Sequence, residues 1–118
     1  MLTFKLYMEF TPQTCEEAAG ALRSLVGPVR AEAGCSATRL QRDTEDGCGL
    51  IWVEEWRSAE DFEQHLRAKA FRQILAVIEL AALPPTVEID DVASRRGFEF
   101  VEEILGQTQV NQAEHETG

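Results

Sequence analysis

The sequence lacks several features on which whole classes of proteins depend. Its 118 residues contain no run of about 18 apolar residues, so we expect no membrane-spanning helix and no membrane partner. The first ten residues have no basic region followed by a continuous apolar stretch, which argues against a signal peptide. No phosphate loop, nucleophile elbow or metal-binding box occurs, and the eight glycines are scattered. Chemistry, if present, must therefore rest on individual residues.

Cysteine and histidine are scarce. Cys15, Cys35 and Cys48 form no Cys-x-x-Cys pair, and their odd number without a secretion signal predicts free thiols in a reducing cytoplasm. His65 and His115 are far apart in sequence. Because a dedicated zinc or iron site needs three or four convergent ligands, we predict no metal site.

Positive charge is also in short supply. The formal net charge is -10, and a surface that acidic repels phosphate backbones, so nucleic acid is excluded as a partner. The apolar fraction of 44% is that of an ordinary globular domain. A single domain of this length buries a modest core and gains stability from a partner subunit.

Hydrophobic periodicity predicts an α+β domain with the order β-α-β-β-α-β, a ferredoxin-like sandwich. The predicted strands are 2–10, 36–42, 50–56 and 86–92, and the predicted helices are 11–34 and 58–83. We expect the first helix to kink or break at Gly27-Pro28 and to end at Gly34. We assign residues 1–92 to this domain. Residues 93–118 form an extension, with a short amphipathic helix at about 97–105 and a frayed tail after it.

The third predicted strand is apolar on both faces. Leu50 and Trp52 point one way, and Ile51 and Val53 point the other. Such a strand is covered on both sides, and in so small a chain a second subunit is the best source of the second layer. The pattern therefore predicts a homodimer.

His65 is the candidate base, because histidine most often serves that role near neutral pH. It lies at the margin of an apolar helix face, where it either faces a cavity or is simply hydrogen-bonded at the edge of the core. Trp52 and Trp56 share one strand face with Glu54. They form either an aromatic wall for a planar phenolic ligand or ordinary core packing.

Other polar residues are weaker candidates. Glu54 and Glu55 point in opposite directions, so at most one of them serves a given pocket. The other is either solvated or paired with an arginine, and Arg39 across the hairpin is the candidate partner. The pair Arg95-Arg96 either closes over an anionic substrate, pairs with a partner subunit or lies in a solvated turn. Cys35 follows a helix end, and no neighbouring base is visible for it, so we interpret it as a buried small residue.

The block from residue 32 to residue 71 resembles the antibiotic-biosynthesis-monooxygenase family of dimeric α+β barrels. The matching residues are Glu32-x-Gly34-Cys35, Glu54/Glu55-Trp56-x-Ser58, Phe62, His65-Leu66 and Phe71. The resemblance implies a ferredoxin-like subunit that dimerises sheet on sheet, with a site between sheet and helices. Its haem-degrading branch carries an axial histidine where this chain has Leu75, and an asparagine where it has Tyr7-Met8-Glu9, so haem degradation is disfavoured.

The family resemblance implies, as the leading function, a cofactor-independent monooxygenase acting on a phenol- or quinol-like small aromatic molecule. His65 would remove a phenolic proton, and an arginine or backbone donor would stabilise the anion that then reduces oxygen. Substrate-binding residues would be Trp52, Glu54, Trp56 and Phe62. Two alternatives stay open: a non-catalytic ligand-binding or structural dimer, and a small-molecule isomerase.

Overall fold

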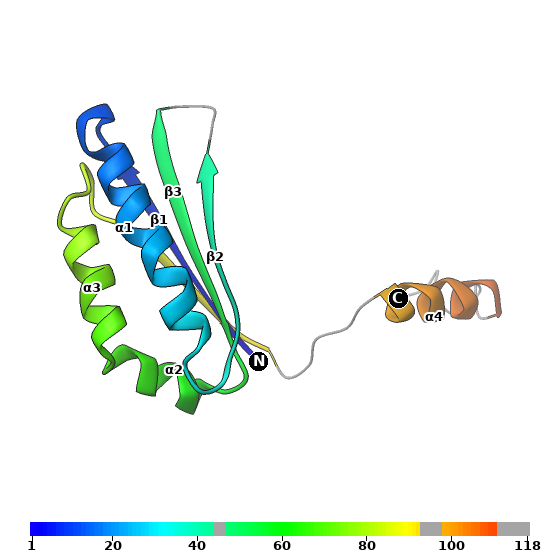
Figure 1. Cartoon of the computed structure of the whole chain (residues 1–118). Helices are drawn as coiled ribbons and strands as arrows, with labels where there is room; N and C mark the ends of the chain where they lie inside the picture. The colour runs from blue at the N-terminus through cyan, green and yellow to red at the C-terminus, as the bar shows by residue number, and fades with distance from the viewer. Residues whose placement is uncertain (44–46, 93–97, 111–118) are drawn as a thin grey trace.

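The computed structural model of the chain describes residues 1–43, 47–92 and 98–110. Figure 1 shows the path of the chain through strands and helices. The elements in order are β1 (Leu2–Phe10), α1 (Pro12–Arg30), β2 (Cys35–Asp43), β3 (Cys48–Trp56), α2 (Ala59–Leu66), α3 (Lys69–Ile78), β4 (Thr86–Asp91) and α4 (Phe98–Val110). The predicted α+β class and the β-α-β-β-α-β order are confirmed, with the second helical segment in two pieces.

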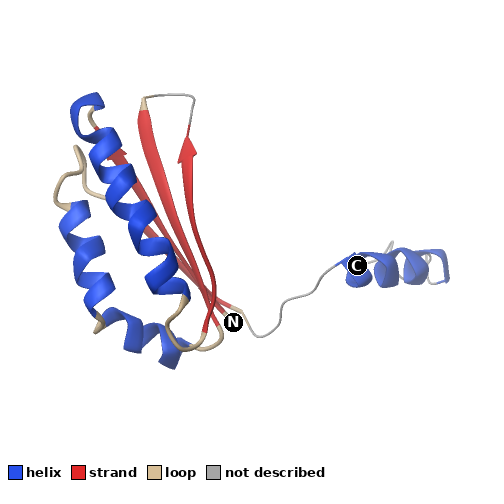
Figure 2. Cartoon of the chain, viewed as in Figure 1, coloured by secondary structure: helices blue, strands red, loops and turns tan. Residues whose placement is uncertain are grey.

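The four strands form one antiparallel sheet in the order β2-β3-β1-β4. This is the ferredoxin-like order, in which the first and third strands are neighbours at the centre. Helices α1, α2 and α3 lie on one side of the sheet (Figure 2). Within the described part of the chain the sheet is open and does not close into a barrel.

The core lies between the sheet and the helices α1 to α3, and α1 makes the largest helical contribution to it. Every second residue of β1 is buried, as the alternation of the sequence predicts. Helix α1 places its own apolar stripe against this row. The buried residues of the two elements are Leu2, Phe4, Leu6, Met8, Phe10, Cys15, Ala18, Ala19, Leu22, Leu25 and Val29.

Helix α1 continues through Pro28, so the expected break at Gly27-Pro28 is wrong. Proline removes one backbone donor, but Pro28 lies in the last turn, where only two more helical residues follow. The helix ends at Arg30, earlier than predicted. Gly34 has the expected positive φ, 84°, but it lies in the turn that leads into β2.

The predicted second helix is divided at Arg67 and Ala68. Ala68 is extended, with φ -81° and ψ 159°, and its N–H bonds to the His65 carbonyl. On one continuous helix, positions 65 and 70 would lie about 140° apart around the axis. The break allows both His65 and Ala70 to be buried, and it leaves Leu66 38% exposed although the periodicity placed it in the apolar stripe.

The last described elements carry exposed apolar side chains. On β4, Val87 and Ile89 pair with the core residues Leu6 and Phe4 but are about half exposed. The predicted short helix is confirmed as α4, which extends to Val110 rather than ending near residue 105. The predictions for Arg95-Arg96 and for the end of the frayed tail lie outside the described residues.

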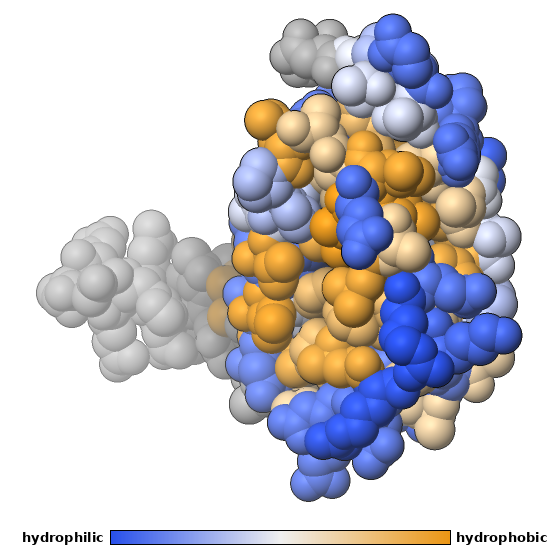
Figure 3. Space-filling view, turned by 90° about the vertical axis from the view of Figure 1, so that its left-hand side faces the viewer, coloured by the Kyte–Doolittle hydropathy of each residue, from blue (hydrophilic) through white to orange (hydrophobic). Residues whose placement is uncertain are grey.

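The surface on the helix side is mixed. Figure 3 shows apolar patches between charged side chains on this face. Exposed large apolar residues of α3 and the segment after it include Leu75, Leu80 and Leu83. In the part of the chain that the structure describes, no helix is both long and apolar enough to cross a membrane.

The expectation of three free thiols is wrong. Cys15 and Cys48 form a disulfide that joins the start of α1 to the start of β3, while Cys35 is free. The two residues are 33 positions apart in the sequence, and their Cα atoms are 5.8 Å apart, a separation that a disulfide spans. An odd cysteine count says nothing about which two residues meet in space, and here the packing of α1 on the hairpin brings them together.

Candidate site: a buried histidine between two glutamates

Helix α2 positions His65 over β3. The helix begins after Ser58, whose hydroxyl accepts a hydrogen bond from the Asp61 N–H at 3.1 Å, as the predicted cap requires. His65 lies in the last turn of this helix and is only 1% exposed. Its ring is therefore held inside the domain and not at the surface.

Both ring nitrogens of His65 contact carboxylates. Nε2 lies 2.8 Å from Glu54 Oε2, and Nδ1 lies 2.9 Å and 3.1 Å from the two oxygens of Glu32. Glu54 comes from β3, and Glu32 comes from the turn between α1 and β2. The imidazole thus connects a fully buried carboxylate to one whose side chain is 22% exposed.

Glu54 is completely buried and accepts hydrogen bonds from three side chains. Trp52 Nε1–H donates to Oε2 at 2.6 Å, and Trp56 Nε1–H donates to Oε1 at 2.9 Å. His65 is the third donor. A buried carboxylate is tolerated when it is paired and hydrogen-bonded, and these three donors supply both conditions. The interpretation of Trp52, Glu54 and Trp56 as sharing one strand face is confirmed.

The two glutamates favour the charged form of the imidazole. Burial alone would lower the pKa of His65, but hydrogen bonds and the negative charges of Glu54 and Glu32 outweigh it and raise the pKa above 6.5. A protonated imidazole donates from both nitrogens, which agrees with an acceptor at each. The arrangement is a carboxylate–imidazolium–carboxylate chain that leads from the core toward the surface.

Aromatic rings surround the histidine. The Trp56 and His65 ring centroids are 4.8 Å apart, and the Phe71 ring meets the imidazole edge to face at 5.4 Å. Phe62, one turn earlier on α2, packs between Phe4 and Trp56. These contacts exclude water and strengthen the electrostatic interactions inside the cluster.

The cluster is closed in this conformation. Trp52 and Trp56 are 0% exposed and Phe62 is 6% exposed. Within the described residues, every buried side-chain nitrogen and oxygen has a hydrogen-bond partner. Two hollows of about 230 and 220 Å³ are open at the surface, but neither is lined by His65 or by the predicted substrate-binding residues. The structure therefore brings the predicted residues together without showing a space for a ligand among them.

The larger hollow lies at one end of the sheet. Its lining comes from β1, the end of β2, β3, the start of β4 and the segment before β4. It includes Tyr7, Glu9, Asp43, Ile51 and Leu83. Sequence reasoning did not single out these residues as a group, because they are distant in sequence and share no motif. The Tyr7 hydroxyl donates to Glu88 Oε2 at 3.2 Å across the neighbouring strands.

Two further expectations about individual residues can be compared with the structure. Arg39 does pair with Glu55 across the hairpin, at 3.7 Å, so the predicted opposite orientation of Glu54 and Glu55 is confirmed. Cys35 is partly buried, and burial raises the pKa of its thiol, which makes it a weak nucleophile. Sequence reasoning did not identify Glu32 as a partner of His65. The available signal was its place in the Glu32-x-Gly34-Cys35 segment that resembles the family.

The carboxylates around His65 are not arranged as a metal site. Among the residues that the structure describes, no group of three or more His, Cys, Asp and Glu side chains is placed to hold a metal ion. The two carboxylates lie at opposite nitrogens of the His65 ring, so they do not converge on one point. What the arrangement can do is hold a proton in the core and pass it along hydrogen bonds.

These features define the class: a small ferredoxin-like α+β domain with a buried histidine, held between two glutamates, in the space between sheet and helices. The family model for antibiotic biosynthesis monooxygenase matches residues 1–77, more than half of the 118 residues. The chain belongs to the antibiotic biosynthesis monooxygenase family, which confirms the resemblance found in the sequence.

Solved structures agree with this assignment. PA3566 from Pseudomonas aeruginosa is 27% identical with a TM-score of 0.69, and the alignment covers 79% of this chain and 94% of that protein. Rv0793 from Mycobacterium tuberculosis is 22% identical with a TM-score of 0.72, covering 81% and 98%. A crystal structure described as an antibiotic biosynthesis monooxygenase is 23% identical with a TM-score of 0.71, covering 80% and 100%. No protein among those with curated functions matches the sequence.

Proposed function

We propose that this chain is a cofactor-independent monooxygenase that oxidises a small phenol- or quinol-like molecule. Its family and the names of its structural neighbours support an oxygenase role. The observation that carries the proposal is the chain of hydrogen bonds from Glu54 through His65 to Glu32. The reaction requires removal of a phenolic proton. Among the described residues, these three hydrogen-bonded side chains are the buried group between sheet and helices that can accept and transfer a proton.

The reaction balances without an added reductant. A hydroquinone loses a proton, and the electron-rich anion reduces oxygen; the products are a hydroxyquinone, which retains one oxygen atom, and water. The raised pKa favours the protonated form of His65, so the three side chains act as one base. A carboxylate accepts the substrate proton, and the imidazolium between the two carboxylates balances their charge.

Access to this site requires a movement of α2. The helix has eight residues, carries both Phe62 and His65, and is separated from α3 by the extended Ala68. Its displacement from β3 would open a space walled by Trp52 and Trp56, the residues predicted to contact the substrate. Their flat rings suit a planar aromatic molecule, which is the substrate class we propose.

The test measures oxygen chemistry in purified protein treated with a chelator. With a hydroquinone as the probe, oxygen uptake and incorporation of one ¹⁸O atom from ¹⁸O₂ into the quinone product are expected. His65→Gln should reduce the rate about 10²- to 10⁴-fold, the usual contribution of acid–base catalysis. Glu63→Gln, on the exposed side of the same helix, is the matched control and should keep full activity.

The outcomes separate the function from the assigned residue. Absence of enzymatic oxygen uptake with all hydroquinones tested overturns the monooxygenase proposal. Full turnover in a folded His65→Gln protein removes His65 from the mechanism but leaves the activity in place. Product formed without oxygen uptake identifies the isomerase alternative.

A non-catalytic dimer is the second candidate, and the closed cluster favours it. Side chains fill the space between the sheet and the helices, and His65 is hydrogen-bonded inward. This arrangement is expected when the histidine stabilises the core and has no catalytic role. In that case His65→Gln lowers the free energy of unfolding but no activity exists to lose. The same oxygen-uptake assay therefore distinguishes the two.

We also propose that the protein is a homodimer built sheet on sheet. The described helices α1 to α3 cover one side of the sheet and leave the other without a helical layer (Figure 1). On that side Val53 is already buried between Lys5 and Arg39 of the neighbouring strands, and Ile51 is partly buried. Light scattering after size exclusion should give twice the 13.2 kDa chain mass; a mass of one chain contradicts the dimer.

Two further assignments belong to this proposal. Residues 1–92 act as the folded domain and residues 93–118 as its extension. A chain truncated after residue 92 should therefore still unfold in one cooperative transition. The protein works in the cytoplasm, where a reducing environment would act on its disulfide. Fractionation of cells that produce it would test this location.

A further inference from the structure

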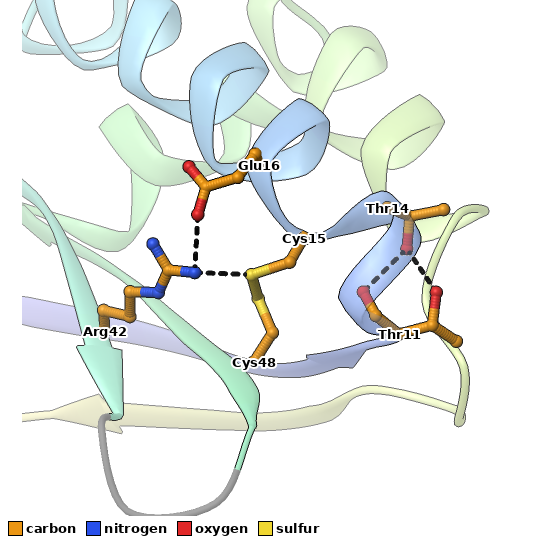
Figure 4. Close-up of a disulfide and its surroundings, with 6 residues drawn as sticks. All are labelled: Thr11, Thr14, Cys15, Glu16, Arg42 and Cys48. Carbon is orange, nitrogen blue, oxygen red and sulfur yellow. Dashed lines mark hydrogen bonds and ion pairs between the residues drawn. A yellow bond between two sulfur atoms is a disulfide. The ribbon is translucent and has the colours of Figure 1, made fainter.

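The disulfide between Cys15 and Cys48 has chemically unequal sulfur atoms. Figure 4 shows the bond joining α1 to the first residue of β3, with Arg42 of β2 reaching across from the neighbouring strand. Arg42 Nη2–H donates to Cys15 Sγ at 2.7 Å. Of the two sulfur atoms, Cys15 Sγ is therefore the one that lies against a cation.

A cation beside a sulfur atom matters when the S–S bond breaks. The guanidinium stabilises a thiolate at Cys15 and so makes Cys15 the better leaving group. The same Arg42 nitrogen also donates to Glu16 Oε1 at 2.8 Å, and this carboxylate offsets part of its charge. Arg42 and Glu16 thus act in opposite directions on the sulfur.

A hollow gives small molecules access to this bond. It has a volume of about 220 Å³ and is lined by both cysteines, together with Pro12, Glu16, Arg42 and Gly47. Elsewhere the cysteines are covered, since each residue is only 4% exposed. A small thiol can therefore approach the disulfide from the side that holds Arg42.

We propose that Cys15–Cys48 is a thiol–disulfide exchange site for small thiols and dithiols, in which Cys48 is the sulfur attacked and Cys15 leaves. The incoming thiolate forms a bond to Cys48 Sγ as the S–S bond breaks, and the electron pair goes to Cys15 Sγ beside Arg42. A second thiolate attacks the incoming sulfur of the mixed disulfide and releases Cys48, which takes a proton from water. Two thiols become one disulfide, and the protein gains two electrons.

This site is separate from the proposed monooxygenase chemistry. Exchange at Cys15 and Cys48 breaks the covalent link between α1 and the hairpin of β2 and β3, and leaves the Arg42–Glu16 ion pair in place. Cys35 takes no part, because its thiol is partly buried, contacts Thr38 and has a raised pKa. The oxidation state of one bond thereby decides how firmly the N-terminal turn of α1 is held.

The test follows the reduction of the full-length oxidised protein by dithiothreitol, with rapid alkylation and mass measurement. Arg42→Gln should slow reduction about three- to tenfold, and Glu16→Gln should speed it by a similar factor, because leaving-group ability follows the thiol pKa. Arg39→Gln removes the same charge from the opposite face of β2 and should leave the rate within about twofold.

A second measurement locates the attacked sulfur. After a brief exposure to 2-mercaptoethanol and an acid quench, peptide mapping should find the adduct mainly on Cys48. Equal rates for Arg42→Gln and Arg39→Gln, an adduct mainly on Cys15, or air-oxidised protein with both thiols free would each overturn the proposal. The Glu16→Gln variant keeps Arg42 in place, so it tests the proposal even where Arg42→Gln fails to fold, and slower reduction of this variant would also overturn it.

Discussion

His65 Nε2 lies 2.8 Å from Glu54 Oε2, and both side chains are inaccessible to solvent. This ion pair crosses the interface between α2 and the central strand β3. Taking two charges out of water is costly, and here that cost is offset by two indole donors on Glu54 and by a second carboxylate on His65. The pair thus fixes the helix over the sheet while it holds a proton in the core.

The first prediction concerns the removal of one partner. Glu54→Gln leaves the buried imidazole without its inner counter-charge and should lower the free energy of unfolding by about 3–5 kcal/mol. Glu55→Gln is the matched control at the adjacent position on the opposite face, where the pair with the half-exposed Arg39 measures 3.7 Å. Its expected cost is about 1 kcal/mol or less. Urea unfolding of both variants provides the comparison, and equal losses would contradict the assignment.

The second prediction is a pH dependence of stability. The pKa of His65 in the folded state is raised above its unfolded value of 6.5. The stability linked to its proton is therefore fully present below about pH 6.5, and it is lost as the pH rises through the folded pKa. The free energy of unfolding should fall as the pH rises above about 6.5, with a slope of at most about 1.4 kcal/mol per pH unit.

Two variants isolate this effect. The measurement is made in a Cys35→Ala background, because the raised pKa of that thiol also makes the stability depend on pH at higher pH. Glu32→Gln removes one of the two charges that raise the His65 pKa, so the decline should end at a lower pH and its total size should be smaller. The free energy of unfolding of His65→Gln should be nearly independent of pH over the same range. A flat curve for the protein with His65 intact would show that folding does not shift the pKa of the histidine, which contradicts the prediction.

The sheet and the first helix could be predicted because their signals are local. The alternation along β1 predicts its buried face directly, because the even-numbered residues from Leu2 to Phe10 are apolar and are the buried ones. Trp52, Glu54 and Trp56 on one face follow from the same rule. The pairing of Arg39 with Glu55 required only the hairpin and opposite charges.

The rest depends on tertiary packing that no local pattern encodes. The break at Ala68 lies inside a stretch of good helix formers, so local propensity does not predict it. With the break in place, His65 and Ala70 are both buried. Glu32 reaches His65 across 33 positions. Cys15 meets Cys48 only because α1 packs along the hairpin, and sequence spacing does not encode that contact.

The third prediction concerns Gly34 in the turn that precedes β2. Its φ of +84° disfavours any residue with a Cβ, and an added Cβ would collide with the Asp61 side chain of α2. Gly34→Ala should lower the free energy of unfolding by about 1–3 kcal/mol. Gly20→Ala, in α1 with open space around the new Cβ, should raise it by about 0.5–1 kcal/mol. Opposite signs in thermal or urea unfolding are the expected result, and a neutral Gly34→Ala would contradict the turn geometry.

The fourth prediction is the contribution of the disulfide to stability. The bond closes a loop between residues 33 positions apart, and the loss of chain entropy in the unfolded state predicts a stabilisation of about 3–4 kcal/mol. The double variant Cys15→Ala/Cys48→Ala should lose about this amount in non-reducing urea unfolding. Dithiothreitol should destabilise the native protein by a comparable amount and leave the double variant unchanged. Cys35→Ala is the control, because Cys35 is free and the variant should respond to dithiothreitol as the native protein does. A native protein whose unfolding curve is the same with and without reductant would mean that the bond does not hold α1 to β3 in solution.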